Sequence, residues 1–416
     1  MKRYPLTENR AGKILFGLFL FAILYLTRSG FTSSAILGIN PSQFVTLGLV
    51  GILGLVFLFR NRGQWKQILT DKRLMVALVA SVLLLLPAAA KRDWQLMYLS
   101  VLVCLYIAVF LTYFISYREA AKYHVCILTV IGVYSVIATY LLRRLPDNGS
   151  LSVPVVYTNR MIDFYNFGLT FVSGIYVKNR NFGIFREPGV YQYFIMLALF
   201  LNNYAVQWKK QRTMWIVNVL LAVTMLTTFA TGGIAELGLF VILVFFDKKL
   251  YKDKRAVIAA IVLILVGAAG LAVIVMQKGQ LYWELYGMVI AKIFGGEASS
   301  TERIDAVRIN LEFFMNNPIF GEKLATVLYA LENNTTSTLL MLAIFGVGGG
   351  ALHIAAWVAL VWDKERHWLV NLTLLLILFL SFNTQNLIAD VFFWLFPVMA
   401  LTERVVPWLE NRKKKV

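Results

Sequence analysis

The chain has 416 residues, of which 59% are hydrophobic and 15% charged, and its mean hydropathy is +0.70. A soluble protein of this length does not need so much apolar surface, so the composition predicts a membrane protein with many helices. The formal net charge of +18 is typical of proteins that bind nucleic acid, but the excess Lys and Arg lie in short loops between apolar runs. This distribution argues against a nucleic-acid partner and indicates a membrane topology signal.

Twelve apolar runs predict membrane-spanning helices, with a tight turn at 231–233 between the seventh and eighth. When loops are assigned alternately to the two sides, most Lys and Arg fall on the side of the N-terminus, so both termini are predicted to be cytoplasmic. The fold class is therefore all-α, a single polytopic transmembrane domain over residues 1–416. The predicted spans are 13–31, 43–59, 74–90, 94–116, 124–142, 189–207, 214–230, 234–246, 256–276, 337–361, 368–381 and 387–402.

Two long segments between spans, 143–187 and 277–336, are predicted to face outward. Loops of this length in a compact protein usually carry function. In the second loop, residues 281–294 read as an interfacial amphipathic helix. A second helix follows and is expected to end at Pro318 and Gly321. Its apolar stripe is predicted from the helical spacing of Ile304, Val307, Leu311 and Phe314.

Cofactor and metal sites are not expected from this sequence. Cys104 and Cys126 both lie inside predicted spans and are expected to be small core residues. The three histidines are scattered without metal-ligand spacing. There is no Asp-x-Asp metal motif, phosphate-binding loop or dinucleotide fingerprint.

Charged residues precede the sixth predicted span in the stretch "RNFGIFREPG". Pro188 suits the first turn of a helix, so this span is predicted to begin there, with its N-terminus at the outer face. Helix N-termini attract anions, and arginine binds phosphate in a bidentate manner. Arg180 and Arg186 therefore predict a diphosphate site, in which Glu187 orients an arginine or acts as a base. Local pairing of Arg186 with Glu187 is the alternative.

Ionisable residues inside predicted spans are costly and are functional candidates. Glu236 lies near the start of the eighth span and Asp390 near the start of the twelfth, both towards the predicted outer face. The central and inner parts of the spans carry almost no charge, which argues against an ion path through the membrane. The pattern favours a polar site that opens outward, with interfacial ion pairing as the alternative.

The second outer loop contains two arginines five residues apart, Arg303 and Arg308. Arg308 has Asp305 and Glu312 at helical spacing, which indicates pairing at the surface. Arg303 has no acidic residue at the corresponding positions. Arg303 is therefore the candidate for function and Arg308 for structure.

These features together resemble the O-antigen polymerase/ligase superfamily of bacterial envelope glycosyltransferases. The stretch "RNFGIFREPG" is similar to that family's Arg-x-x-Gly-x-Phe-x-Glu-Pro motif. Residues 301–321 resemble its outer-loop helix, which is led by an arginine and ends in Pro and Gly. Residues 333–350 resemble its entry to a glycine-bearing span, where Gly346 and Gly350 have the GxxxG spacing of close helix packing.

The resemblance implies a Wzy-type polymerase with a membrane fold like that of GT-C glycosyltransferases. Such enzymes join oligosaccharide repeats carried on undecaprenyl diphosphate at the outer face of the bacterial cytoplasmic membrane, in O-antigen, capsule or exopolysaccharide synthesis. The ligases of the family carry a histidine where this chain has Thr335 and Thr336, which favours a polymerase over a ligase. The resemblance implies that Arg180, Arg186 and Arg303 bind the diphosphate. It implies that Glu187, or else Glu236, accepts the proton.

The expected partners are the lipid-linked oligosaccharide, membrane lipid, a chain-length regulator and a flippase. A ligase-type transferase is one alternative. The other is a lipid-linked oligosaccharide flippase, which would need polar groups at the centre of the bilayer and usually has shorter outer loops.

Overall fold

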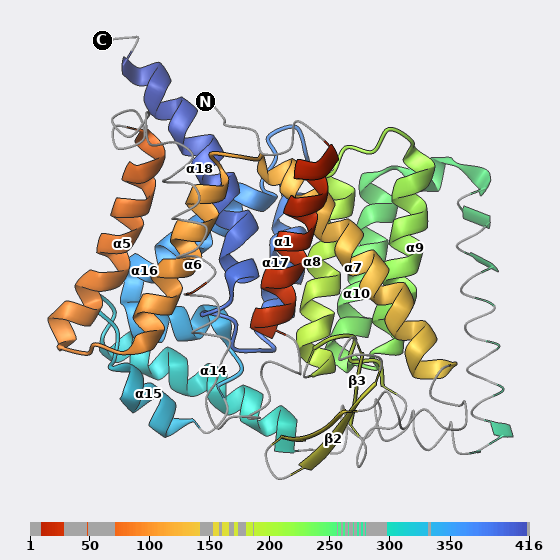
Figure 1. Ribbon diagram of the computed structural model, residues 1–416, viewed down its shortest axis with the longest axis horizontal. Helices are drawn as coiled ribbons and strands as arrows, with labels where there is room; N and C mark the ends of the chain where they lie inside the picture. Colours follow the sequence, from red (N-terminus) through yellow and green to blue (C-terminus); the bar gives the residue numbers. More distant parts are fainter. Residues whose placement is uncertain are drawn as a thin grey trace.

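The computed structural model describes residues 10–28, 71–141, 153–157, 160–165, 170–173, 180–185, 187–255, 298–331 and 334–413, with Gly48 and isolated positions between 257 and 279. These residues are predominantly helical, as predicted, and the long helices run side by side as a bundle (Figure 1). The predicted spans 43–59 and 256–276, Arg186 and the predicted helix at 281–294 fall wholly or mainly outside the described residues.

Every predicted span that falls on described residues coincides with a helix. The helices of the bundle are α1 (Arg10–Arg28), α5 (Lys72–Lys91), α6 (Leu96–Leu111), α7 (Tyr117–Tyr140), α8 (Pro188–Tyr204), α9 (Gln211–Thr227), α10 (Thr231–Asp247), α16 (Ser337–Val361), α17 (Trp368–Phe382) and α18 (Val391–Lys413). Four segments are long and apolar enough to cross a membrane by length and composition: Lys72–Lys91, Tyr117–Tyr140, Ser337–Val361 and Val391–Glu410. These helices are consistent with a membrane protein.

The helices pack in two groups, one of α5, α6, α16 and α18 and the other of α7, α8, α9, α10 and α17. The groups meet where α16 contacts α17 and where α18 contacts α7. α8 lies inside the second group and is buried around almost its whole circumference. A helix that is apolar all round belongs in such a central position. The residues at its N-terminus are consequently held by several neighbours.

The turn between α9 and α10 differs from the prediction. Thr231, Gly232 and Gly233 form the first turn of α10, and the chain reverses instead at Thr228–Ala230. Phe229 has a positive φ of 47° there, and its N–H donates to the carbonyl of Leu226. The two glycines are therefore not turn residues. Because they have no side chains, the side chain of Gln192 can lie directly against the first turn of α10.

Three short strands form an antiparallel sheet in the first long loop, which the sequence reasoning did not predict. β1 (Val153–Tyr157) pairs with β2 (Arg160–Tyr165), and β2 pairs with β3 (Thr170–Ser173). The valines of β1 have high strand propensity, so the signal was present in the sequence. The chain is thus a helical bundle with a small sheet at one end (Figure 1).

The second long loop contains α14 (Ala298–Asn316) and α15 (Leu324–Ala330), and α14 lies across the lower end of the bundle in Figure 1. The predicted apolar stripe is not the face by which α14 packs. Ile304, Val307 and Leu311 are exposed, whereas Ala306 and Asn310 are buried. A small residue and an amide face the bundle because α14 approaches the ends of other helices closely.

Helix α16 is broken at Gly346, which has φ 61° and ψ −160°. The backbone of Pro318 and Ile319 enters this break, and the N–H of Val347 donates to the carbonyl of Pro318 at 2.8 Å. A Cβ atom at position 346 would collide with the carbonyl of Ile319. The prediction that Gly346 allows close packing of two helices is therefore wrong. Gly346 instead packs against the loop at Pro318 and Ile319. The side chain closest to Gly350 is that of Leu342, on the same helix.

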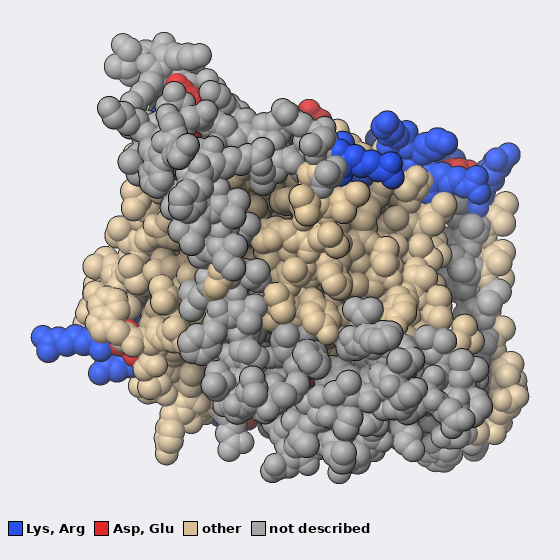
Figure 2. Space-filling view, in the orientation of Figure 1, with Lys and Arg blue, Asp and Glu red and all other residues tan. Residues whose placement is uncertain are grey.

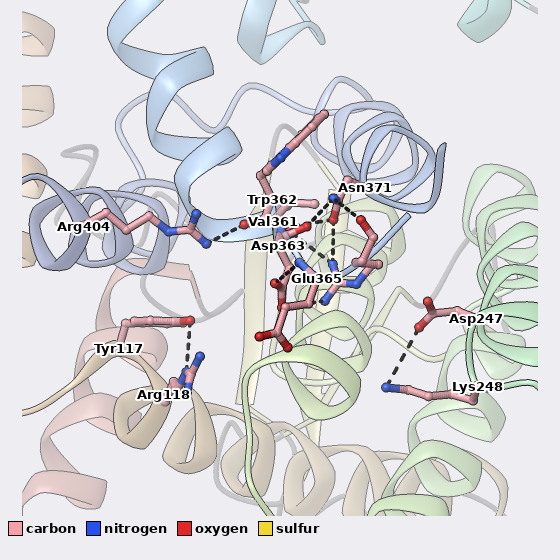
Figure 3. Close-up of polar contacts among 11 residues, drawn as sticks. Tyr117, Arg118, Asp247, Lys248, Val361, Trp362, Asp363, Glu365, Asn371 and Arg404 are labelled. Atoms are coloured by element: carbon pink, nitrogen blue, oxygen red, sulfur yellow. Dashed lines mark hydrogen bonds and ion pairs between the residues drawn. The ribbon is translucent and has the colours of Figure 1, made fainter. Parts of the chain in front are cut away.

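The upper end of the bundle is held by a polar cluster around the turn between α16 and α17 (Figure 3). Asn371 is fully buried, and its amide nitrogen donates to the carbonyl of Asp363 at 2.8 Å while its oxygen accepts from the N–H of Asp363 at 3.2 Å. Arg366 donates to the same oxygen at 3.0 Å and stacks on the ring of Tyr204 at 4.3 Å. These contacts tie α8 and α17 together at this end.

Charge is distributed unevenly over the surface in Figure 2. A broad band across the middle shows almost no Lys, Arg, Asp or Glu, and basic residues gather along the upper edge on the right. The loops at the upper ends of α9 and α10 carry exposed basic residues, among them Lys209, Lys210, Lys248 and Lys249. An uncharged band with a basic edge is the surface pattern of a bilayer-spanning protein.

Candidate functional site

The candidate residues lie at the lower end of the bundle in Figure 1, where α8 and α10 begin and where α14 packs against α16. Arg180 and Glu187 precede α8, Glu236 lies in the second turn of α10, and Arg303 lies in α14. The structure thus places the described sequence candidates at one end of the molecule. Arg186, the remaining candidate, lies outside the described residues.

A tight turn holds Arg180 against the end of α9. The guanidinium Nε of Arg180 donates to the carbonyl of Thr228 at 2.9 Å. The next residue, Asn181, is fully buried, and its side chain donates to Ser135 and Thr227, both at 3.0 Å. The oxygen of the Asn181 side chain accepts from the N–H of Gly183 at 2.9 Å, which closes the turn. The hydrogen bonds of Asn181 therefore fix the backbone of this turn and, with it, the position of Arg180.

The electrostatic environment of Arg180 has two opposing parts. Burial lowers the pKa of Arg180 to about 10, and the negative charge of Glu187 acts in the opposite direction. The guanidinium remains charged at neutral pH because this pKa is well above 7. A partly desolvated cation of this kind interacts more strongly with an anion than an exposed one.

Helix α8 begins at Pro188, as predicted, with Glu187 in the N-cap position. Glu187 makes no side-chain capping hydrogen bond, so its carboxylate does not satisfy the first N–H groups of the helix. Gly189 follows, and a Cβ atom there would stand 2.7 Å from Nε2 of Gln385. The amide of Gln385, from the loop between α17 and α18, therefore lies directly against the start of α8.

Glu236 is a buried carboxylate one turn into α10, and α8 holds it in place. Its Oε1 accepts a hydrogen bond from Nε2 of Gln192 at 2.9 Å. Its Oε2 is buried and lies close to Oγ of Ser381, without a hydrogen bond of standard geometry between them. Burying a carboxylate costs free energy unless it is paired or hydrogen-bonded. Buried ionisable groups of this kind are concentrated at functional sites in proteins. Residues from α8, α10 and α17 thus converge on one carboxylate.

Arg303, in the other long loop, acts electrostatically on this carboxylate. Its charge is close enough to Glu236 for the two to attract each other electrostatically. The side chain of Arg303 is exposed, so it remains accessible to a ligand that approaches the lower end. The positive charge of Arg303 thus acts on a carboxylate that lies 67 positions away in the sequence.

Two other sequence candidates have structural roles. Arg308 pairs with Asp305 at 3.3 Å along α14, which confirms the surface pairing predicted for it. Asp390 caps α18, because its Oδ1 accepts from the N–H groups of Phe392 and Phe393 at 2.6 and 3.2 Å. Its position at the start of α18 is therefore explained by helix capping.

Among the residues that the structure describes, the fully buried charged side chains are Arg73, Asp93, Glu236 and Asp390. Each of them lies at or near the end of a helix rather than at its centre. Asp93, for example, follows α5 and accepts from the N–H of Leu324 at 2.7 Å. In the described part of the bundle, the buried charges therefore avoid the centres of the helices, as the sequence indicated for the central parts of the spans.

No group of His, Cys, Asp and Glu suited to a metal ion occurs within the described ranges. Cys104 and Cys126 are both free thiols. Cys104 is buried, as predicted, but Cys126 is exposed on α7, so the prediction that it lies in the core is wrong. His124 and His353 are buried among aromatic rings. The polar groups described at the lower end are carboxylates, arginines, amides and hydroxyls.

The sequence reasoning missed two of the residues that contact Glu236. Gln192 is the one amide in the first turns of an otherwise apolar helix start, which was an available signal. Ser381 gave no signal, because a serine near the end of an apolar helix is common in membrane proteins. Their partnership with Glu236 depends on how α8, α10 and α17 pack.

Comparison with known proteins gave no relative: no protein-family model matches the chain, and no curated protein matches it in sequence.

Proposed function

We propose that this protein is a membrane glycosyltransferase that polymerises oligosaccharide repeats carried on undecaprenyl diphosphate. The observation that carries the proposal is the buried carboxylate of Glu236, held by Gln192 and influenced by the charge of Arg303, at the end of the bundle where Arg180 is fixed. Two cations and a carboxylate at one end are what a glycosyl transfer from a diphosphate carrier requires. The motif resemblance in the sequence supports the same reading.

In the proposed reaction, a hydroxyl of one lipid-linked repeat attacks the anomeric carbon of a glycan held on another carrier. A new glycosidic C–O bond forms, the bond from the anomeric carbon to the phosphate oxygen breaks, and undecaprenyl diphosphate leaves. Negative charge grows on the diphosphate during this step, so fixed cations lower the barrier. We assign that stabilisation to Arg180 and Arg303, together with Arg186, as the sequence motif implies.

The proton of the attacking hydroxyl needs an acceptor, and we assign Glu236 to that role. Glu236 is held by one hydrogen bond at Oε1, while Oε2 makes no hydrogen bond and keeps its lone pairs for the proton of a hydroxyl. General-base catalysis by such a carboxylate typically contributes about 10²- to 10⁴-fold. Glu187, which the sequence favoured, sits beside Arg180 and is assigned to orienting it.

We place the site at the outer face of the bacterial cytoplasmic membrane, with both termini inside. The basic residues beyond the upper ends of α9 and α10 support this orientation, because such residues are enriched on the cytoplasmic side. The lower end, which carries Glu236 and Arg303, would then meet substrates delivered by a separate flippase.

The test is chain growth in proteoliposomes that contain the purified protein and lipid-linked repeats. We expect glycans of several repeats without ATP or added divalent metal. Movement of the lipid-linked repeat across the bilayer without chain growth would instead support a flippase. Transfer of one completed glycan to a lipid A acceptor, again without chain growth, would support a ligase.

A further inference from the structure

A buried amide clasp joins α14 to the start of α16. Asn310 is fully buried, and its Nδ2 donates to the side chains of Asn334 and Thr336 at 3.0 and 2.9 Å. Asn334 returns a hydrogen bond from its own Nδ2 to Oδ1 of Asn310 at 3.0 Å. Both polar ends of the Asn310 side chain are therefore used, and a fully satisfied buried network favours one geometry over its alternatives.

The amide clasp matters because most large apolar side chains of this part of α14 face away from the bundle. Ile304 is 68% exposed and Met315 is 72% exposed, and Val307 and Leu311 also face away from the bundle. The buried positions are Ala306, which has a single methyl group, and Asn310. The hydrogen bonds of Asn310 thus act together with the half-buried Phe313, which packs against the core, to define the rotation of α14 about its own axis.

Asn310 and Arg303 lie on the same face of α14. They are seven residues apart, which at 100° per residue is about 20° short of two full turns. The clasp that turns Asn310 towards α16 therefore also turns Arg303 towards the bundle, where its charge reaches Glu236. The C-terminal end of α14 has a separate anchorage, in which the loop after Pro318 enters the break in α16.

We infer that Asn310 is a positioning residue, which sets the rotation of α14 so that Arg303 faces Glu236. As a statement about catalysis this rests on the proposed function, since it makes Asn310 act on chain growth through Arg303. The claim that Asn310 sets the rotation of α14 does not depend on the proposed function. Asn310 itself is assigned no contact with substrate.

The geometric part is tested by a distance measurement between spin labels. The labels are placed at Arg303→Cys and Phe246→Cys, in a chain that also carries Cys104→Ala and Cys126→Ala. Phe246 is exposed on α10, well away from Glu236 along the helix. We expect Asn310→Ala to broaden or shift the distance distribution. The matched variant Asn316→Ala, at an exposed position on the same helix, is expected to leave it unchanged.

The catalytic part is tested by chain growth per folded protein. We expect Asn310→Ala to lower the rate about 10- to 100-fold, as displacement of a catalytic group by about an ångström does. In an Arg303→Ala background, Asn310→Ala should cause no further loss. Thr336→Val, which removes one partner of the clasp, serves as the milder variant if Asn310→Ala does not fold.

An unchanged distance distribution in Asn310→Ala, or in Thr336→Val where that variant is used, would overturn the inference. So would a further loss of rate when the clasp is altered in the Arg303→Ala background. If the wild-type protein shows no chain growth at all, the proposed function fails, and the distance measurement still decides whether Asn310 orients α14.

Discussion

Gly183 and its neighbours show how single residues fix the start of the candidate site. Gly183 has a φ of 56°, in the left-handed region that residues with a side chain rarely adopt. A Cβ atom there would also stand 2.7 Å from the ring of Tyr191. The glycine allows Asn181 to close the turn, and this turn places Arg180 beside Thr228.

Replacing Gly183 with alanine is expected to destabilise the fold by about 1 to 3 kcal/mol, the usual cost of a strained backbone position. The additional contact with Tyr191 acts in the same direction. Thermal unfolding of the purified protein measures the effect. Gly238→Ala is the control, because a Cβ atom at that position in α10 meets nothing within 4 Å. Equal melting temperatures for the two variants would contradict this view of the turn.

Arg303 and Arg308 provide a matched pair on one helix. Arg308 pairs with Asp305 at the surface, while the charge of Arg303 reaches Glu236. We expect Arg303→Ala to lower the rate of chain growth about 10²-fold or more, in the range seen when one group that stabilises transition-state charge is lost. Arg308→Ala should change it less than about twofold, since an exposed pair contributes little. Equal rates in the two variants would remove Arg303 from the site.

At the scale of elements, α14 and α16 show where pattern reasoning stops. The spacing of Ile304, Val307 and Leu311 is that of an amphipathic helix, but those residues are exposed and the opposite face packs on the bundle. The face that packs carries Asn310, which the periodicity treats as a polar position. Periodicity reveals two faces and does not say which neighbour each face meets.

The break in α16 is a second element-scale feature with a testable consequence. Gly346→Ala would force Ile319 away from the break and disturb the docking of the loop that follows α14. We expect a loss of about 1 to 3 kcal/mol in stability from the strained conformation alone. Unfolding of Gly348→Ala is the comparison, since its Cβ atom would meet Leu83 at an ordinary 3.5 Å. If Gly346→Ala is as stable as Gly348→Ala, the break does not need a glycine.

The turn between α16 and α17 depends on Asn371. Asn371→Ala removes two part-buried hydrogen bonds to the backbone of Asp363, and each lost hydrogen bond costs roughly 0.5 to 1.5 kcal/mol. We therefore expect a clear fall in melting temperature. Chain growth per folded molecule should stay near the wild-type value. The turn between α16 and α17 lies at the upper end of the bundle, whereas α10, near whose start Glu236 lies, begins at the lower end (Figure 1). Gln207→Ala, exposed in the loop between α8 and α9, is the control for stability. A large fall in activity without a fall in stability would contradict this assignment.

At the scale of the whole molecule, much of the helical architecture could be predicted from the sequence. Apolar runs mark the bundle helices because each must bury or expose a mainly hydrophobic surface, and Pro188 marks the start of α8 because proline fits the first helical turn. The sheet at 153–173 was missed because the loop was treated as irregular, although its valines favour strands.

The candidate site was only partly predictable, for a physical reason. Glu236 and Arg303 were found singly, because charges in or near apolar helices are costly and conspicuous. The hydrogen bond from Gln192 to Glu236 joins residues 44 positions apart, and the approach of Arg303 depends on the clasp at Asn310. Such partnerships arise from helix packing, which one sequence without its tertiary contacts does not specify.

The most direct test of the central claim compares the glycans made by the wild-type protein and by Glu236→Gln in proteoliposomes supplied with lipid-linked repeats. Glutamine keeps the size of the side chain and cannot accept the proton of an attacking hydroxyl as a carboxylate does. Glu322→Gln, in the loop after α14, controls for loss of a carboxylate. We predict long chains from the wild-type and Glu322→Gln proteins, and chain growth at least about 10²-fold slower from Glu236→Gln at equal folded amount. Chain growth by Glu236→Gln at the wild-type rate, or none by any of the three proteins, would contradict the account.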